Sequence, residues 1–199
     1  MNLYEETNML LNQYGLKANK KLGQNFLINQ QIIDDIIEKS EITKEDTVLE
    51  IGTNTGALLI YASRFNPKKM IGIDINEKAV ELAKKNMELN GINNCELIVA
   101  DGNTYQSEEV DVIIFNPPYF KTPSKDLGNN EYLALAKHED NFSLESMVNC
   151  INRNLRNMGT VYFLFQTSRL NEVIKLFNSK KLIIKKLQFV YDVNKDISN

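Results

Sequence analysis

The chain has 199 residues, of which 43% are hydrophobic and 25% are charged, and its formal net charge is −3. These totals fit one globular domain. No stretch reaches the length of a membrane span and the N-terminus lacks a signal-peptide layout, so we expect a cytoplasmic protein. The single histidine and the two distant cysteines, Cys95 and Cys150, disfavour a zinc site, a disulfide framework and a histidine-based triad, and we expect no metal.

Short apolar runs alternate with segments of helical periodicity along the chain. Strands are predicted over 47–52, 70–75, 95–101, 110–116, 160–166 and 181–192. Helices are predicted over 30–40, 76–91, 143–158 and 168–179, with Asn76 capping the second and Gly159 ending the third. Residues 117–142 are expected to form a long loop. This alternation indicates an α/β fold, a parallel sheet with helices on both faces, in which ligands bind at the carboxyl ends of the strands.

Three of the predicted strands end in residues that suit a nucleoside ligand. The first runs into the segment Glu50-Ile51-Gly52-Thr53-Asn54-Thr55-Gly56, where glycines allow the backbone to approach a ligand closely. The Gly-Lys-Ser/Thr ending of a phosphate loop is absent. Asp74 ends the second strand, where a carboxylate can accept both hydroxyl hydrogens of a ribose. Asp101-Gly102 ends the third, where the carboxylate can accept a hydrogen from an adenine amino group.

The tetrapeptide Asn116-Pro117-Pro118-Tyr119 follows the fourth predicted strand. The prolines fix the backbone, so that the Asn116 side-chain oxygen and the Pro117 carbonyl can point at one place. Two acceptors that hold both hydrogens of an exocyclic amino group favour a pyramidal nitrogen whose lone pair can attack a methyl group. Catalysis would then consist mostly of positioning and electrostatics. Tyr119 and Phe120 offer faces on which a splayed-out base could stack.

With these motifs the whole chain resembles the class I S-adenosylmethionine-dependent methyltransferases, whose amino-methylation motif is Asn-Pro-Pro-Tyr. Residues 66–192 are similar to the bacterial tRNA-valine adenine-37 N6-methyltransferases, in the stretches DVIIFNPPYF (111–120), LAKHEDNFSLESMV (135–148), FLFQTSRLNEVIKLF (163–177) and LQFVYD (187–192). Residues 8–63 are instead similar to the 16S rRNA adenine dimethyltransferases, in LNQYGLKANKKLGQNFLIN (11–29) and VLEIGTNTGAL (48–58). The rRNA enzymes usually carry leucine or isoleucine in place of the first proline of the tetrapeptide. They also have a C-terminal helical domain. The tetrapeptide of this chain therefore favours tRNA as the substrate.

The resemblance implies S-adenosylmethionine as cofactor, RNA as partner and one domain over 1–199, with a cofactor lid over 1–28 and a Rossmann-like core over 29–199. The implied catalytic residues are Asn116, Pro117, Pro118 and Tyr119. The implied cofactor contacts are Gln24, Asn25, Leu27, Glu50, Gly52, Thr53, Gly56, Asp74, Ile75, Asp101, Gly102 and Asn116. The implied substrate contacts are Tyr119, Phe120, Lys137 and His138.

The chain departs from the family patterns at three points. Asn54 stands where the motif usually has its middle glycine, and Lys137 stands where the tRNA family usually has arginine. The superfamily's seventh strand, which lies between strands five and six, is missing from the predicted elements.

Four hypotheses follow from this sequence. The first is N6 methylation of adenine in RNA, with tRNA favoured over rRNA. The second is rRNA adenine dimethylation, and the third is methylation of a protein glutamine amide, for which the same tetrapeptide is used. The fourth is a non-catalytic protein that retains cofactor or RNA binding. Lysines cluster at 17, 20 and 21 and again at 175, 180, 181, 185 and 186, and they form either an RNA-facing patch or a solvated face.

Overall fold

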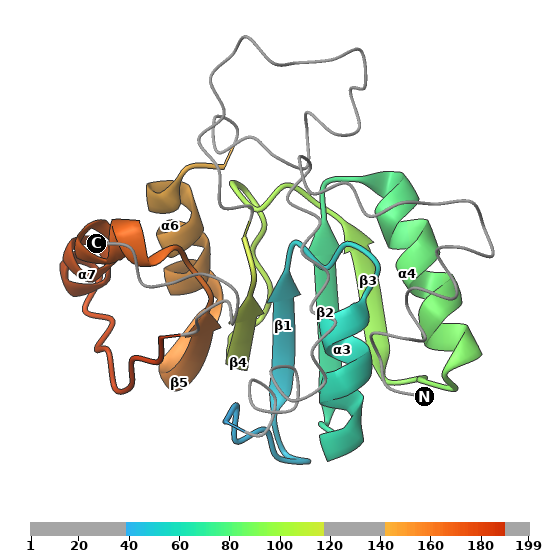
Figure 1. The fold of residues 1–199 in the computed structure, drawn as a ribbon. Coiled ribbons are helices and arrows are strands. Elements are labelled where there is room, and N and C mark those ends of the chain that lie inside the picture. The colour runs from blue at the N-terminus through green and yellow to red at the C-terminus, as the bar shows by residue number, and fades with distance from the viewer. Residues whose placement is uncertain (1–38, 118–141, 190–199) are drawn as a thin grey trace, which may run out of the picture.

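A five-stranded parallel sheet forms the centre of the structure, with strand order β3-β2-β1-β4-β5 (Figure 1). The computed structural model describes residues 39–117 and 142–189. The strands are β1 (Thr47–Ile51), β2 (Lys69–Asp74), β3 (Cys95–Val99), β4 (Val110–Phe115) and β5 (Leu155–Phe163). The helices are α3 (Ala57–Ala62), α4 (Glu77–Leu89), α6 (Leu144–Asn154) and α7 (Leu170–Ser179), with 3-10 turns η2 (Ser63–Phe65) and η3 (Thr167–Arg169). The predicted α/β fold is confirmed.

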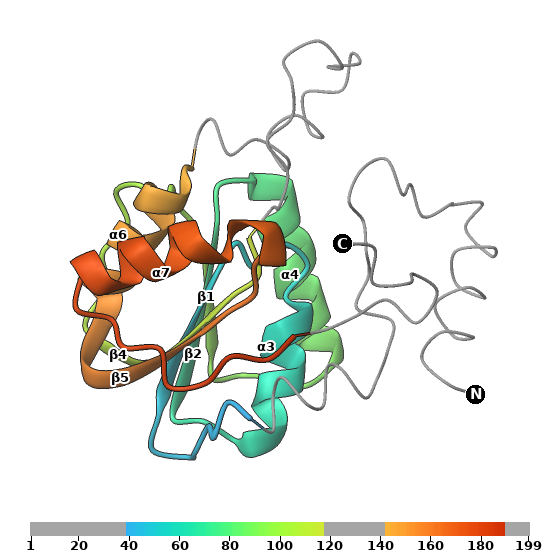
Figure 2. The ribbon, with the colours of Figure 1, turned by 60° about the vertical axis from the view of Figure 1, so that its left-hand side comes forward.

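Helices cover both faces of the sheet (Figure 2). Because side chains alternate along a strand, each strand supplies both faces. On one face α3 and α4 pack against residues such as Val48 and Ile114. On the other, α6 and α7 pack against residues such as Leu49 and Ile113. The continuous apolar runs of β1 and β4 are thus those of strands buried on two sides.

The chain enters α4 as the sequence predicts. The side chain of Asn76 accepts hydrogen bonds from the backbone N–H groups of Lys78, at 3.1 Å, and Ala79, at 3.3 Å. This N-cap satisfies donors that have no partner within the helix, and it fixes where the chain leaves β2.

Two predicted boundaries near the end of the chain are wrong. The helix predicted over 143–158 ends at Asn154, and β5 begins at Leu155 rather than at 160. Gly159, expected to stop the helix, lies inside β5, where an added Cβ would meet the Asp111 carbonyl oxygen at 2.9 Å. The glycine is therefore needed for close approach of β5 to β4, where the register shifts between Val110 and Val112.

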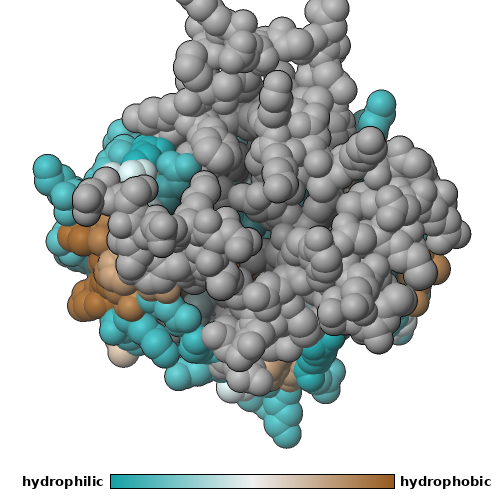
Figure 3. All heavy atoms as spheres, in the orientation of Figure 1, coloured by the Kyte–Doolittle hydropathy of each residue, from teal (hydrophilic) through white to brown (hydrophobic). Residues whose placement is uncertain are grey.

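The last predicted strand, 181–192, is also wrong in its described part, because residues 182–189 form no strand. Its β-branched and apolar residues match strand propensity, but a strand forms only where a neighbour offers hydrogen bonds. Several apolar side chains here are exposed instead: Ile183, Ile184, Leu187 and Phe189. Figure 3 shows apolar surface on the side where β5 and α7 lie. Of the helix predicted over 30–40, only Lys39 and Ser40 fall within the described residues, and they lie in a turn.

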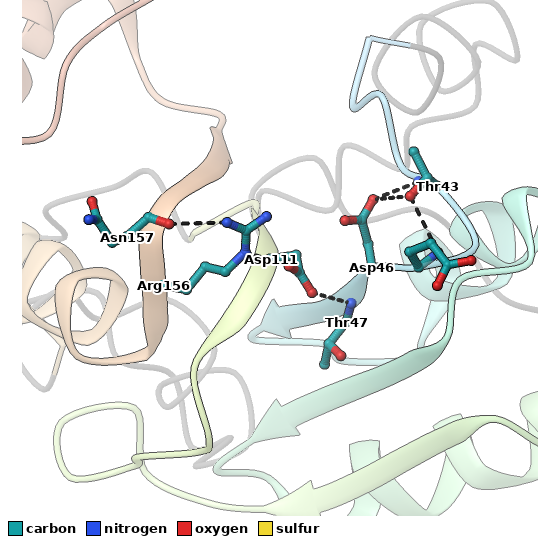
Figure 4. A network of polar contacts seen from close by, with 7 residues as sticks. Thr43, Asp46, Thr47, Asp111, Arg156 and Asn157 are labelled. Atoms are coloured by element: carbon teal, nitrogen blue, oxygen red, sulfur yellow. Dashed lines mark hydrogen bonds and ion pairs between the residues drawn. The ribbon is translucent and has the colours of Figure 1, made fainter.

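A polar network ties the amino ends of three strands together (Figure 4). The Asp111 carboxylate of β4 accepts a 2.7 Å hydrogen bond from the Thr47 N–H of β1 and forms an ion pair with Arg156 of β5. Partial burial of Asp111 opposes ionisation, but these donors outweigh it and hold the pKa of Asp111 below its ordinary value. The network lies at the edge of the sheet opposite to the predicted ligand site. Among the helices of the described ranges, none has the length and apolar character needed to span a bilayer.

Candidate active site

The register of β1 and β4 brings two of the predicted site segments together. Ile51, the last residue of β1, pairs with Phe115, the last residue of β4. The next residues of the two strands, Gly52 and Asn116, are therefore neighbours at the carboxyl edge. The glycine turn and the start of the tetrapeptide thus lie side by side although more than sixty residues separate them in the sequence.

The ends of β2 and β3 continue the same edge. The register of β1 with β2 places Asp74 beside Gly52. Asp74 pairs in turn with Val99, and its carbonyl accepts a 2.9 Å hydrogen bond from the Ala100 N–H. Asp101 follows Ala100 directly. The two residues predicted to bind the ribose and the adenine, Asp74 and Asp101, therefore come from adjacent strands. Ile75, next to Asp74, is 52% exposed at this edge.

The turn after β1 relies on three residues with positive φ: Gly52 at 70°, Asn54 at 47° and Gly56 at 78°. Asn54 thus adopts the left-handed conformation, in which asparagine is the residue best tolerated after glycine. A Cβ at Gly56 would lie 2.6 Å from Cε of Met87, so the packing of α4 requires a glycine there. Asparagine can therefore stand at the position of the middle glycine, because it tolerates the left-handed backbone that the turn adopts there.

Asp74 is fixed by the backbone on both sides. Its Oδ2 accepts a 2.9 Å hydrogen bond from the Asn54 N–H, and its Oδ1 accepts one of 2.9 Å from the Asn76 N–H. Each carboxylate oxygen has two lone pairs, so Asp74 retains capacity for ribose hydroxyl groups. The residue therefore shapes the turn and keeps lone pairs available at this edge of the sheet.

Glu50 and Thr53 lie beneath the turn, with exposed fractions of only 4% and 3%. The Thr53 hydroxyl donates a 2.6 Å hydrogen bond to Glu50 Oε2. Burial away from water raises the pKa of Glu50 to about 8, and the negative charge of Asp74 adds to this, while the Thr53 hydrogen bond opposes it. The sequence predicts both residues as cofactor contacts, and in the structure their side chains are buried beneath the turn and bond to each other.

The Asp101-Gly102 turn is closed by hydrogen bonds of its own and packs against an aromatic ring. Asp101 Oδ1 accepts hydrogen bonds from the backbone N–H of Asn103, at 2.8 Å, and from its side chain, at 2.9 Å. No hydrogen bond within the described ranges uses Oδ2. A Cβ at Gly102 would meet the Phe142 ring at 2.6 Å, so only glycine allows this ring to lie against the turn.

An aromatic cluster supports the end of β4. The buried Phe115 ring lies 5.9 Å from the ring of Phe142 and 5.6 Å from that of Phe163, measured between centroids. The Phe115 carbonyl also accepts a 3.0 Å hydrogen bond from the Leu164 N–H. Asn116 is half-buried directly after this anchored residue. The position of Asn116 is therefore set by packing as well as by strand pairing.

The other predicted site residues lie outside the described residues. They are Gln24, Asn25, Leu27, Pro118, Tyr119, Phe120, Lys137 and His138. Pro117, which is buried, ends the described part of the tetrapeptide.

Within the described part of the chain, the remaining nucleophilic and metal-ligating groups point to no other site. Across 39–117 and 142–189, no three histidine, cysteine or acidic side chains cluster as metal ligands would. Burial raises the pKa of the thiol of Cys95 to about 12 and that of Cys150 to about 11, so both stay protonated at neutral pH.

A family model described as ribosomal RNA adenine dimethylase matches residues 15–183. The chain belongs to this family. The match agrees with the resemblance of residues 8–63 to the rRNA enzymes and extends it over the sheet. The resemblance of residues 66–192 to the tRNA-valine enzymes gains no support from it.

Two named methyltransferases are similar to parts of the chain. A ribosomal RNA small subunit methyltransferase A of Clostridium botulinum is 35% identical over 122 residues, which are 58% of this chain and 43% of the relative. A candidate protein N5-glutamine methyltransferase of Methanocaldococcus jannaschii is 42% identical over 93 residues, 47% of this chain and 46% of the relative. The matched parts thus span less than half the length of these relatives.

Solved structures share the fold. A dimethyladenosine transferase from Plasmodium falciparum superposes with a TM-score of 0.55 at 24% identity, over 73% of this chain and 45% of that one. A SAM-dependent methyltransferase from Thiobacillus denitrificans, solved with S-adenosyl-L-homocysteine, gives 0.50 at 18% identity, over 68% and 48%. These matches confirm a Rossmann-like methyltransferase fold, and S-adenosylmethionine is the cofactor that family and fold imply.

Three residues near the site are not among the sequence predictions: Phe142, Arg153 and Asn154. Phe142 lies next to Ser143, the N-cap of α6, and it belongs to the stretch expected to be loop. Asn154 is fully buried. The spacing of Asn154 in the sequence could have indicated this burial, since a polar residue three positions after Ile151 falls on the apolar face of the helix.

Proposed function

We propose that this chain carries the cofactor-binding and methyl-transfer part of an RNA adenine N6-methyltransferase that acts on rRNA. The observation that carries the proposal is the pairing of Ile51 with Phe115, which sets Asn116-Pro117 beside the Gly52 turn. A methyl donor held by the turn and an amino group held by the tetrapeptide would then meet at one edge of the sheet.

The described residues fit S-adenosylmethionine. Gly52 is exposed at the edge, and among the described residues a Cβ there would meet only Phe115, at 4.0 Å, so the backbone is open to a ligand. Asp74 offers acceptors for the ribose hydroxyls, and Asp101 Oδ2 offers one for the adenine amino group. When bound, the cofactor supplies an electrophilic methyl group on a sulfonium sulfur.

The protein's own contribution to the reaction is to orient an amino nitrogen. The Asn116 side-chain oxygen and the Pro117 carbonyl accept the two amino hydrogens, which directs the nitrogen lone pair at the methyl group. No strong base is required, because the methylated nitrogen is a cation that loses its proton readily. The aromatic support of Phe115 keeps Asn116 in place, and such pre-set geometry is where most of the rate enhancement would arise.

Ribosomal RNA is favoured as substrate by the family match over 15–183 and by the Clostridium botulinum relative. The first proline of the tetrapeptide remains the feature that departs from the rRNA enzymes. A protein glutamine amide is the second candidate, supported by the Methanocaldococcus jannaschii relative. Its nitrogen presents the same lone-pair problem, so Asn116 and Pro117 would have the same task.

Transfer of tritium from labelled S-adenosylmethionine tests these substrates side by side. The acceptors are small ribosomal subunits, bulk tRNA and a peptide release factor, and labelled RNA is digested to nucleosides to identify N6-methyl and N6-dimethyl adenosine. Label in rRNA adenine is the expected result. Label confined to tRNA or to the release factor would overturn the rRNA proposal in favour of that acceptor. Cofactor binding with no transfer to any acceptor would favour the non-catalytic hypothesis.

A further inference from the structure

The loop between β3 and β4 is held by α6, a helix that follows it by about forty residues in the sequence. The loop begins with Asp101 and Gly102, the proposed adenine-recognising turn. Within the loop, the Asp101 carbonyl accepts hydrogen bonds from the N–H groups of Thr104, at 3.0 Å, and Tyr105, at 2.8 Å. These local bonds close a turn but leave the carbonyl groups of Gly102, Asn103 and Tyr105 to other partners.

Arg153, in the last turn of α6, binds three of those carbonyl groups. Its Nη2 donates to the carbonyl of Gly102 at 2.8 Å and to that of Asn103 at 2.9 Å, and its Nε donates to that of Tyr105 at 3.4 Å. A planar guanidinium can reach separate acceptors at once because its donors form a rigid fork. The positive charge also suits the carboxyl end of a helix. Arg153 thus fixes the loop on both sides of Asn103, the residue that binds the Asp101 carboxylate.

Asn154 holds the other end of the loop from a fully buried position. Its Oδ1 accepts a 2.7 Å hydrogen bond from the Ser107 N–H and one of 3.0 Å from the Ser107 hydroxyl. Its Nδ2 donates to the carbonyls of Cys150, at 2.8 Å, and Tyr105, at 3.3 Å. A buried amide with all these bonds made is a rigid anchor, because its removal would take away the acceptor of the part-buried Ser107 N–H.

We propose that Arg153 and Asn154 are positioning residues that hold this loop in the shape in which Asp101 recognises the adenine of the cofactor. The inference rests on the proposed function, since it requires a cofactor at this edge. Neither side chain contacts the proposed ligand position. They act through the backbone of residues 102–107, and their loss would let the Asp101 carboxylate leave the plane of the adenine amino group.

Discrimination between two ligands provides the test, because general loss of stability would not change it. The full chain is titrated calorimetrically with S-adenosylhomocysteine and with S-inosylhomocysteine, in which an oxo group replaces the adenine amino group. The unmodified chain should prefer the adenosyl compound by about tenfold to a hundredfold, as expected for one hydrogen bond to a charged group. Arg153→Ala should bring this ratio close to one, mainly by weakening the binding of S-adenosylhomocysteine.

Two further variants make the experiment decisive. Arg153→Lys keeps the charge and the aliphatic stem but loses the fork, so its ratio should be intermediate, and it serves if Arg153→Ala does not fold. Arg156→Ala is the matched control, since it removes an arginine that ties strands together at the opposite edge, and it should keep the ratio of the unmodified chain.

Each remaining outcome counts against a distinct statement. An unchanged ratio in folded Arg153 variants would overturn this inference and leave the proposed function intact. Equal binding of both ligands by the unmodified chain would overturn recognition by Asp101, and with it the inference, while methyl transfer still decides the proposed function. Failure of the unmodified chain to bind S-adenosylhomocysteine would overturn both.

Discussion

Replacement of Glu50 by glutamine tests how the turn after β1 is supported. Glu50 is 4% exposed and accepts a hydrogen bond from Thr53, and its burial raises its pKa from 4.5 to about 8. Glutamine has the same shape and keeps an acceptor for the Thr53 hydroxyl, but it does not ionise. The substitution therefore removes the titration and changes little else.

The sign of the effect follows from proton binding. Between pH 4.5 and about 8 the folded chain keeps a proton on Glu50 that the unfolded chain has lost, so the stability contributed by Glu50 falls as the pH rises through this window. Each pH unit is worth about 1.4 kcal/mol. From pH 5 to pH 8 the free energy of unfolding of Glu50→Gln, relative to the unmodified chain, should rise by about 4 kcal/mol, and it should then level off above pH 8.

Urea denaturation at five pH values between 5 and 9, followed by circular dichroism, measures this difference. Glu81→Gln, which removes an exposed carboxyl group from α4, is the matched control. The free energies of unfolding of Glu50→Gln and of the unmodified chain are compared as functions of pH. If the two curves run parallel from pH 5 to 8, the carboxyl group of Glu50 is hydrated in solution, and the inference that a buried Glu50 supports the turn is wrong.

Four other predictions address the site, the sheet and the RNA surface. Asn116→Ala should lower kcat by about a hundredfold to a thousandfold and leave the Kd for S-adenosylhomocysteine nearly unchanged, and equal loss of both would remove Asn116 from catalysis. Asp74→Ala should raise that Kd by about tenfold or more, and calorimetry showing unchanged affinity would remove Asp74 from the site. Gly72→Ala should destabilise the chain by about 1–3 kcal/mol in urea, since its Cβ would lie 2.6 Å from Cδ2 of Leu97 in the core. Replacing four lysines with glutamine should make the plot of log K for RNA binding against log salt concentration less steep. The slope should fall by about 0.7 for each phosphate that a lysine no longer neutralises. An unchanged slope would indicate that these lysines form a solvated face and do not contact RNA. These lysines are Lys180, Lys181, Lys185 and Lys186, and the control variant replaces Lys84 and Lys85 of α4.

The tetrapeptide and the family match lead to different substrates for a chemical reason. Asn-Pro-Pro-Tyr serves any amino nitrogen whose lone pair is delocalised, whether in adenine or in a glutamine amide, so it identifies the reaction better than the acceptor. The family match spans residues 15–183 and therefore depends on most of the chain rather than on four residues. Substrate choice depends on surfaces spread over the chain, and a local motif cannot report it.

Local signals in the sequence determined the first four strands and the residues at their carboxyl ends that form the candidate site. The apolar runs of β1 and β4, the Asn76 cap, the aspartate that ends β2 and the one that follows β3 are each contained within a few residues. Their alternation also determined the parallel sheet, and hence the edge at which Gly52, Asp74, Asp101 and Asn116 gather.

The tertiary structure alone decided which residues act from a distance. Leu155 begins β5, and Gly159 lies within it, because β4 offers hydrogen bonds there. Residues 182–189 have strand propensity but form no strand, since propensity is not realised without a neighbouring strand. The burial of Glu50 and the hydrogen bonds of Arg153 to the loop after β3 likewise arise from contacts between segments far apart in the chain. A pattern within a short window of sequence cannot specify such contacts.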